Sequence, residues 1–554
     1  MSRQYHSLEI SFFNEPFDGS DIKTDKTAVI KFFNKAGRIL LTEKYGVPKQ
    51  EQIREFYQKE KRITLDNLYI KNFSLVEITG AHGGENGLSN FSAVNSFFDS
   101  DDVTDFSNLT LKGDINFLNS HFAHGNVTFY KTIFKEGSVD FSNVNFGNGE
   151  VNFQFVEFGD GTISFENTIF GDGDVSFVNT HFGDGKVNFK NVDFGLGVVD
   201  FHFAKFEKGD ISFDKAVFGG SRVDFRRVEF GAGKLDFTRT NFGDGEVNFE
   251  ETEYGKGRKN FKRAVFGKAH VSFELANFGE EEVTFENAEF GEGKLSFFKS
   301  VSGSLVFKNC QLNNYIDLRV ESCNSIDLSN TIVKDIIDLK PGFSKVVIKE
   351  LNLTGVRNLG KIFIDWQEND VYNLIANQKE TSFAEKADQF RTLKEDFNSE
   401  GRYDDEDKAY VEFKRFELLS YKENGLKSKN GSKLKVHLNV FFQNLIFDRM
   451  GLYATNPLRV WSSMIIVYLI FSMLFFIFPF IGGGAIVNGL SPENVEPMHS
   501  FFLSLYYSAI TFFTIGYGDY FPYGPMRWLA CAEGFCGVFM MSYFTVAFVR
   551  KILR

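Results

Sequence analysis

The amino-acid sequence predicts a multidomain protein in which a β-solenoid precedes a helical hairpin and an α-helical membrane part. Three observations support this fold class. Phenylalanine recurs at every twelfth position from Phe117 to Phe297. Two apolar runs, 460–481 and 528–549, carry at most one charged side chain and are each long enough to cross a bilayer as a helix. A chain of 554 residues is also too long for a single hydrophobic core.

The repeat consists of two phenylalanine series and a glycine corner. The first series runs from Phe117 to Phe297, and the second is offset by five positions, from Phe122 to Phe290, with Tyr254 as its one substitution. A Val, Ile or Leu stands two positions before the first series almost every time, with Lys259 as the exception. Such a fixed period of short β-branched triplets indicates a β-solenoid, in which each repeat covers the apolar face of its neighbour.

Two coil sizes fit this period. A coil of one repeat would be a flat sandwich of two short strands, whereas a coil of two repeats, a twenty-four-residue coil, would have four sides. A twelve-residue loop encloses too little room for two phenylalanines and a valine at normal packing density, so the four-sided coil is favoured. Eight coils stacked at about 4.8 Å would form a rod roughly 40 Å long.

The Phe triplets resemble pentapeptide repeats, whose fold is a four-sided, right-handed β-helix. The resemblance implies that the central residue of each triplet points inward. This sequence departs from that pattern by two extra residues in every ten, which the glycine corners are expected to absorb. Corners such as Gly159-Asp160-Gly161 invite a comparison with calcium β-rolls, but those have a nine-residue period, and the acid is missing from Gly195-Leu196-Gly197. We therefore interpret the corners as tight turns, with glycine supplying positive φ.

The segments outside the repeat complete the predicted domain organisation. Helical patterns are expected at 28–42 and 50–61 in a cap over the first coil, because an open solenoid end exposes strand edges. Residues 381–424 keep helical spacing around Gly401 and predict a helical hairpin, which resembles the connector of bacterial proteins that join pentapeptide repeats to an ion-channel pore. The expected boundaries are 1–60 for an α/β cap, 61–360 for the solenoid, 361–425 for the hairpin connector, 426–456 for a basic linker and interfacial helix, and 457–554 for the membrane domain.

The charge pattern around the two apolar runs predicts their orientation. No lysine or arginine lies between Gly482 and Met526, whereas basic residues gather before the first run and after the second. The positive-inside rule then places both chain ends, and with them the solenoid, in the cytoplasm of a cell whose plasma or inner membrane the protein spans twice. Asn456 and Pro457 suit the cap and first position of the first spanning helix. The N-terminus shows no signal-peptide pattern, and no arginine-rich helix indicates a voltage sensor.

Between the two runs lies a motif that can bind dehydrated cations. Thr514, Ile515, Gly516, Tyr517 and Gly518 follow an apolar segment, 500–513, that is too short to span a bilayer. Alternating glycines allow consecutive backbone carbonyls to point into a narrow axis and replace the hydration shell of K⁺. One chain supplies one carbonyl to each layer, so a pore of this kind requires four chains.

Residues 456–554 closely resemble the pore of two-transmembrane potassium channels. The resemblance implies that 504–511 belongs to a pore helix and that Tyr506 and Tyr507 form an aromatic cuff. It also implies that Thr511 and Asp519 support the filter. Ile515 departs from the commoner valine but keeps its carbonyl; Gly516, Tyr517, Gly518 and Asp519 match. The implied permeant ion is K⁺, and the implied assembly is a homotetramer.

Several residues of the second run have two readings. Glu533 either lies behind the filter and tunes it through hydrogen bonds, or lies near the outer interface, solvated or paired between subunits. Gly534 and Gly537 either form a hinge, with Phe544 and Phe548 closing the pore below it, or allow close helix packing while the phenylalanines face lipid.

Composition excludes other functions. The net charge of −12 argues against nucleic acid as the main partner, and no phosphate loop, zinc spacing or dinucleotide fingerprint predicts an enzyme or an organic cofactor. Cys310, Cys323, Cys531 and Cys536 lack metal-ligand spacing and are expected to be packed thiols. We expect a K⁺ channel whose solenoid serves regulation, assembly or binding of a cytoplasmic protein. The alternative is a membrane-tethered scaffold that binds a protein partner and does not conduct.

Overall fold

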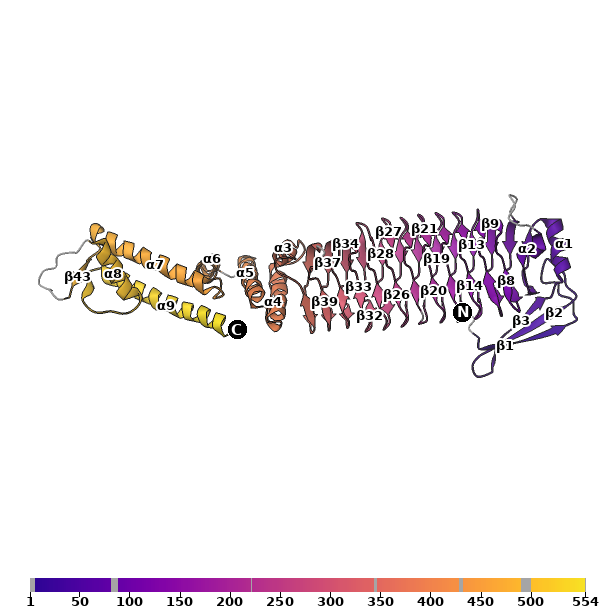
Figure 1. Ribbon diagram of the computed structural model, residues 1–554, viewed down its shortest axis with the longest axis horizontal. Helices are drawn as coiled ribbons and strands as arrows, with labels where there is room; N and C mark the ends of the chain where they lie inside the picture. Colours follow the sequence, from indigo (N-terminus) through magenta and orange to yellow (C-terminus); the bar gives the residue numbers. More distant parts are fainter. Residues whose placement is uncertain are drawn as a thin grey trace. The chain divides into compact units, whose positions relative to one another are not determined.

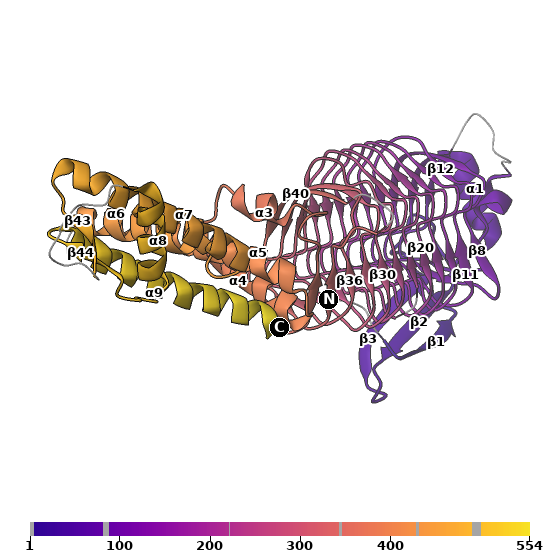
Figure 2. The same cartoon turned by 60° about the vertical axis from the view of Figure 1, so that its left-hand side comes forward.

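The computed structural model describes residues 5–80, 88–220, 222–342, 346–427, 432–489 and 500–553, and the chain divides into two compact units, Met1–Lys379 and Glu380–Arg554. Figures 1 and 2 show the strands of the first unit and the helices of the second.

The first unit begins with an antiparallel sheet of three strands, β1 (Ser7–Phe13), β2 (Thr27–Phe33) and β3 (Ile39–Gly46), followed by helix α1 (Gln50–Glu60). The expected helix at 28–42 is wrong, because this segment forms most of β2 and the first half of β3. The sequence of β2, TAVIKFF, alternates between fully and partly buried residues, which is the period of a half-buried strand. Ala28, Ile30 and Phe32 pack with Tyr69 and Phe97 of the first coils, so the sheet covers solenoid residues as a cap does.

Each regular coil of the solenoid contains two repeats. Val127 pairs with Val151, Val151 with Val175, and Val175 with Val199, all in parallel register. Paired residues therefore lie two repeats apart in the sequence, which confirms the larger coil. One face is a sheet of twelve strands: β8 (Val103–Asp105), β11 (Asn126–Thr128), β14 (Val151–Asn152), β17 (Val175–Ser176), β20 (Val199–Asp200), β23 (Val223–Asp224), β26 (Val247–Asn248), β30 (Val271–Ser272), β33 (Leu295–Ser296), β36 (Ile316–Asp317), β39 (Ile336–Asp338) and β42 (Lys361–Phe363).

On the opposite face, too, each strand pairs in parallel with the strand of the next coil. Its strands are β4 (Ile63–Thr64), β6 (Leu88–Ser92), β9 (Thr110–Asn116), β13 (Val139–Asp140), β16 (Ile163–Ser164), β19 (Val187–Asn188), β22 (Ile211–Ser212), β25 (Leu235–Asp236), β28 (Lys259–Asn260), β31 (Glu282–Thr284), β34 (Val301–Val306), β37 (Ser322–Asp327) and β40 (Val347–Asn352).

The other two faces carry the second phenylalanine series. One consists of β12 (Ile133–Phe134), β15 (Glu157–Phe158), β18 (His181–Phe182), β21 (Lys205–Phe206), β24 (Glu229–Phe230) and β27 (Glu253–Tyr254). The other consists of β5 (Tyr69–Lys71), β7 (Phe97–Asp99), β10 (His121–Phe122), β29 (Val265–Phe266), β32 (Glu289–Phe290), β35 (Gln311–Leu312), β38 (Ile332–Val333) and β41 (Arg357–Asn358), with isolated bridges from His121 to Val265 linking β10 to β29.

Stacked phenylalanine rings fill the interior. Phe153 stacks on Phe129 and Phe177 with ring centroids 4.8 Å apart, the spacing of adjacent coils. It also meets Phe165 of the facing ladder edge-to-face at 5.6 Å. Offset stacked and edge-to-face pairs are the favourable aromatic geometries, so the core gains both burial and ring contacts.

The corners of the coils differ in their backbone conformation and in the space they leave for a side chain. Two corners of each regular coil have a left-handed residue, often asparagine, because such residues recur every twelve positions. The Asn167 and Asn191 amides each donate to the asparagine one coil before at 3.1 Å. Positive φ was expected at the glycine corners and is found at Gly171, but not at Gly161. A Cβ on Gly161 would lie 1.7 Å from the carbonyl oxygen of Gly137, so close approach between coils excludes a side chain there.

Two short helices flank the coils of this unit. Helix α2 (Leu75–Thr79) belongs to the first coils, and α3 (Val371–Ala376) follows the last. The amide of Gln378 donates to the carbonyl oxygen of Leu351, and that of Asn369 donates to Leu339 at 2.8 Å. These bonds occupy carbonyls of the final coils.

The second unit contains the helical hairpin and the apolar helices. The hairpin consists of α4 (Phe383–Ser399) and α5 (Tyr403–Lys427), with Gly401 at φ 72° between them. Helix α6 (Lys433–Phe442) continues into a π-helical segment η1 (Gln443–Arg449). The remaining elements are α7 (Pro457–Ile477), the 3₁₀ turn η2 (Phe478–Ile481), β43 (Ala485–Asn488), α8 (Phe501–Phe512), β44 (Tyr520–Tyr523) and α9 (Met526–Ile552).

Two segments, Pro457–Ile481 and Met526–Ile552, are long and apolar enough to cross a membrane. Asn456 caps the first, as expected: the Arg459 backbone N–H donates to its side-chain oxygen at 3.0 Å, and Pro457 takes the first helical position.

Candidate functional site

The short helix α8 ends in the predicted filter. The backbone N–H groups of Ile515 and Gly516 both donate to the carbonyl oxygen of Ile510, at 2.8 and 3.2 Å, so the chain turns sharply away from the helix. Positive φ then occurs at alternate residues, with 57° at Thr514, 60° at Gly516 and 81° at Gly518. A side chain is tolerated poorly at such angles, which is why glycine occupies two of the three positions.

The five predicted filter residues are contiguous and uncovered by their own chain. Residues 514–518 are all exposed, with half of the Ile515 surface and 71% of the Tyr517 surface accessible. The Thr514 hydroxyl donates to the carbonyl oxygen of Phe513 at 2.7 Å. The backbone oxygens of this segment are therefore available as ligands, and neutral carbonyl oxygen is the donor type suited to an alkali cation.

Tyr506, Tyr507 and Thr511 contact the filter or its surroundings in different ways. The Tyr506 hydroxyl donates to Asp519 Oδ2 at 2.8 Å, across the filter segment. Tyr507 is buried and meets the ring of Phe475 in α7 edge-to-face at 5.0 Å. The Thr511 carbonyl accepts from the Thr514 backbone N–H at 3.1 Å.

A small β-ribbon that sequence reasoning missed holds the segment after the filter. Strand β43 pairs antiparallel with β44, with Ala485 opposite Tyr523 and Asn488 opposite Tyr520. The backbone N–H of Gly489 adds a bond to the carbonyl oxygen of Asp519 at 2.7 Å. The only sequence signal was a short β-branched run at 486–487, which is too brief to predict a strand.

Glu533 lies against the pore-helix candidate α8. Its side chain is fully buried, and Oε1 accepts a hydrogen bond from the Ser508 hydroxyl. Ser508 also lies 3.3 Å from the Tyr468 carbonyl oxygen, and the Tyr468 hydroxyl donates to the Leu505 carbonyl at 3.1 Å. A hydrogen bond between Glu533 and the pore-helix candidate is what the first interpretation of Glu533 requires, in which this residue lies behind the filter and tunes it. Ser508 was missed as a site residue, although a serine in one apolar helix and a carboxylate in another were a signal for pairing.

The two glycines of α9 have different surroundings. A Cβ on Gly537 would lie 1.9 Å from the carbonyl oxygen of Phe512, at the end of α8. A Cβ on Gly534 would meet no atom of the described residues within 4 Å. Gly537 therefore lets α9 approach α8 closely, as in the packing alternative, whereas no packing contact among the described residues explains Gly534.

Phe544 and Phe548 stack on each other, with ring centroids 5.7 Å apart. Phe544 is partly buried against Val460 and Ala547, whereas about half of the Phe548 surface is exposed. Phe548 is thus the better placed of the two to contact another subunit or lipid.

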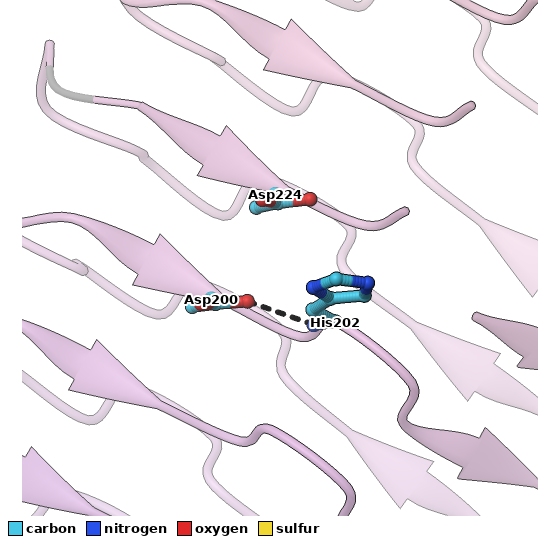
Figure 3. Close-up of side chains that lie close together, drawn as sticks. All are labelled: Asp200, His202 and Asp224. Atoms are coloured by element: carbon cyan, nitrogen blue, oxygen red, sulfur yellow. Dashed lines mark hydrogen bonds between the residues drawn. The ribbon is translucent and has the colours of Figure 1, made fainter. Parts of the chain in front are cut away.

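The solenoid holds one group of three potential metal ligands within its described residues, Asp200, His202 and Asp224 (Figure 3). The Asp224 carboxylate is buried and already bonded by Arg226 Nε at 3.0 Å and by Arg222. Burial raises the pKa of Asp200, and although Asp224 is also buried, the bonds from Arg226 lower its pKa. The arginines supply the positive charge that a metal would bring, so the group is a closed ion-pair cluster.

The corner aspartates are engaged in backbone bonds. Asp160 Oδ1 accepts from the Asp184 N–H at 3.0 Å, Asp174 from Val198 at 2.8 Å, and Asp210 from Lys234 at 2.9 Å. Each carboxylate caps a backbone N–H one coil later, which agrees with the turn interpretation.

The comparison with protein families supports an ion channel. A family model described as "Ion channel" matches residues 463–554, the segment that contains most of α7 together with α8, the filter candidate and α9. Neither the curated proteins nor the solved structures contain a match to this chain. The C-terminal segment of this chain thus matches an ion-channel family, and in the same chain it follows a β-solenoid. Its two apolar helices indicate a location in a lipid bilayer.

Proposed function

We propose that this protein is a K⁺-selective channel in which four chains surround one pore. The observation that carries the proposal is the segment 514–518, uncovered by its own chain and with φ positive at alternate residues. With φ positive at every second residue, successive carbonyl groups can point to the same side of the backbone, as a column of carbonyl ligands requires. The proposed ligands are the carbonyl oxygens of Thr514, Ile515, Gly516 and Tyr517.

The surroundings of this segment support selectivity by a held backbone. Tyr506 and Asp519 bridge its two ends, the β43–β44 ribbon holds the chain after it, and the Ser508–Glu533 bond fixes α8 to α9. A filter that must distinguish two monovalent cations benefits from ligands whose positions are maintained by such neighbours.

The chain ends and the solenoid are proposed to lie in the cytoplasm, as the distribution of lysine and arginine indicates. Helix α6 is proposed to lie on the inner membrane face. Its exposed apolar side chains, Leu434, Leu438, Phe441 and Phe442, alternate with Lys433, Lys435 and His437, a composition suited to the interface. The solenoid would then serve regulation, assembly or the binding of a cytoplasmic protein.

The test is ion flux into liposomes that contain the purified full-length protein. We expect K⁺ uptake from the wild type and none from Gly516→Asp, whose side chain at positive φ would distort the column. Thr545→Ala is a control, because its hydroxyl bonds the Met541 carbonyl within α9. Absence of K⁺ uptake by the wild type would contradict the proposal and favour the scaffold alternative.

A further inference from the structure

The end of α9 is bound to the start of α5 by a group of ion pairs. Arg550 Nη2 lies 3.0 Å from Asp407 Oδ1 and 3.5 Å from Glu406 Oε1. Lys551 Nζ lies 2.9 Å from Asp404 Oδ1 and 3.5 Å from Asp407 Oδ2. Residues far apart in the chain are therefore joined through charged hydrogen bonds.

Two features make this contact stronger than a surface ion pair. The Arg550 guanidinium lies over the Tyr410 ring, 4.4 Å from its centroid, and adds a cation–π interaction. The side chains of Arg550 and Asp407 are only 22% and 11% exposed, so solvent screens them less than it screens exposed charges. The acidic N-terminus of α5 also faces the basic C-terminus of α9, and each charge suits its own helix dipole.

Helix α5 holds the segment before the first span as well. The Arg415 guanidinium contacts both carboxylate oxygens of Asp448 in η1, with the shortest distance 2.8 Å, and also bonds Glu412 at 2.7 Å. Planar bidentate contacts of this type fix orientation as well as distance.

Helix α9 contacts that same segment through Tyr543. Its hydroxyl donates to the Phe447 carbonyl at 3.2 Å and accepts the Ala454 backbone N–H at 3.0 Å. The three residues Leu452, Tyr453 and Ala454 have φ of 46°, 56° and 63°, which is unfavourable for non-glycine residues and persists only where the surroundings hold it. Tyr543 is one of the groups that hold it.

We propose that the start of α5 is a latch on the inner end of α9, and that releasing it opens the pore. This inference rests on the proposed channel function. Helix α9 runs without a break from Met526 to Ile552, and in the hinge alternative a bend in this helix is what would open the pore. Phe548, the exposed ring of the candidate gate, lies close to Arg550 in the sequence. In chain order the hairpin lies between solenoid and pore, so a partner that moves α5 would act on the gate through these charges.

Single-channel recording with a charge swap tests the latch. Arg550→Glu and Asp407→Arg should each raise open probability several-fold, because each places like charges together. The double variant, which restores opposite charges, should return open probability toward the wild-type value. Glu417→Lys is the matched control: it makes a similar charge change on α5, where Glu417 pairs with Lys414 of the same helix. Unchanged or lowered open probability in both single variants, or a swap that restores nothing, would overturn the proposal.

Hydrogen–deuterium exchange separates failure of the latch from failure of the channel function. It is measured on the full-length protein in detergent, so it does not depend on conduction. In Arg550→Glu the amides of the last two turns of α9 should exchange at least about threefold faster, and in Glu417→Lys at the wild-type rate. Unaltered exchange in Arg550→Glu would overturn the latch even if the wild type conducts, whereas altered exchange in a protein without K⁺ flux would refute only the channel.

Discussion

A Cβ placed on Gly537 would lie 1.9 Å from the carbonyl oxygen of Phe512, so the second apolar helix touches the backbone at the end of the pore-helix candidate. This contact gives the glycine a steric role that does not depend on bending. Gly534, one turn earlier, has open space at the same atom among the described residues. Substitutions at Gly537 and Gly534 therefore compare a glycine at a close helix contact with one that has open space.

Gly537→Ala should destabilise the membrane domain, because α9 and α8 must move apart to admit the methyl group. We expect a lower melting temperature of the detergent-solubilised protein and reduced K⁺ flux. Gly534→Ala should leave the melting temperature unchanged, or raise it slightly through better helix propensity. Equal effects of the two substitutions would contradict the packing role, and an effect on gating by Gly534→Ala alone would favour a hinge at that glycine.

Tyr506→Phe should weaken the filter without unfolding the protein. The substitution removes the hydroxyl that donates to Asp519 Oδ2 at 2.8 Å and leaves the ring in place. Hydrogen bonds to charged acceptors are among the stronger ones in proteins, so without this bond the filter should lose conduction sooner in low external K⁺. Macroscopic current decay measures this. Asp519→Asn, which keeps an acceptor oxygen, should have a smaller effect, and identical decay in wild type and Tyr506→Phe would refute the bracing role.

Ser508→Ala should resemble Glu533→Leu in its effect on conduction, because either change breaks the same bond between α8 and α9. Losing both partners should do little more than losing one, since they act as a pair. A double-mutant cycle on single-channel conductance or filter stability measures the coupling. Additive effects of the two substitutions would show that they act separately.

Phe213→Ala should destabilise the solenoid by roughly 3–5 kcal/mol through the cavity it leaves. Phe213 is fully buried and stacks on Phe189 and Phe237 at 4.7 Å. Phe203 is the matched control, because it is 45% exposed and left-handed at φ 59°. Phe203→Asn should be neutral or stabilising. Urea unfolding followed by far-UV circular dichroism tests both, and a loss at Phe203 equal to that at Phe213 would contradict the ladder account.

Lys259 should make solenoid stability depend on pH. Burial lowers the pKa of Lys259 from 10.5 to about 8, and its Nζ donates to the carbonyls of Gly255 and Phe278 at 2.6 and 2.7 Å, which a neutral amine can also do. Between about pH 8 and pH 10.5 the unfolded chain binds the proton that the folded chain has lost, so stability rises with pH in this window. The free energy of unfolding of the wild type, relative to that of Lys259→Leu, should therefore increase from about pH 7.5 to about pH 10. A constant difference would contradict this assignment.

Periodicity alone was enough to predict the solenoid. The twelve-residue spacing indicated the repeat, and the volume of Phe117 and Phe122 together favoured two repeats in a coil, which the pairing of Val127 with Val151 confirms. Local composition also predicted the Asn456 cap and the turn at Gly401, because both depend on residues adjacent in sequence.

Contacts between distant residues could not be predicted in this way. The sequence indicates that Glu533 needs a polar partner, but it does not show that the partner is Ser508, nor that Arg550 meets Asp407, since each contact depends on how two helices are oriented. The expected helix over 28–42 was wrong for a related reason. The segment is a strand because Ala28, Ile30 and Phe32 pack on Tyr69 and Phe97 of the coils, and this contact is between residues distant in the sequence.

The most direct test of K⁺ selectivity is the reversal potential of single channels in a planar bilayer with K⁺ on one side and Na⁺ on the other. If the carbonyls of residues 514–517 form the proposed ligand column, the reversal potential should correspond to at least a hundredfold preference for K⁺, and Gly516→Asp should pass no current. A reversal potential near zero, which means comparable permeability to Na⁺ and K⁺, would contradict the account.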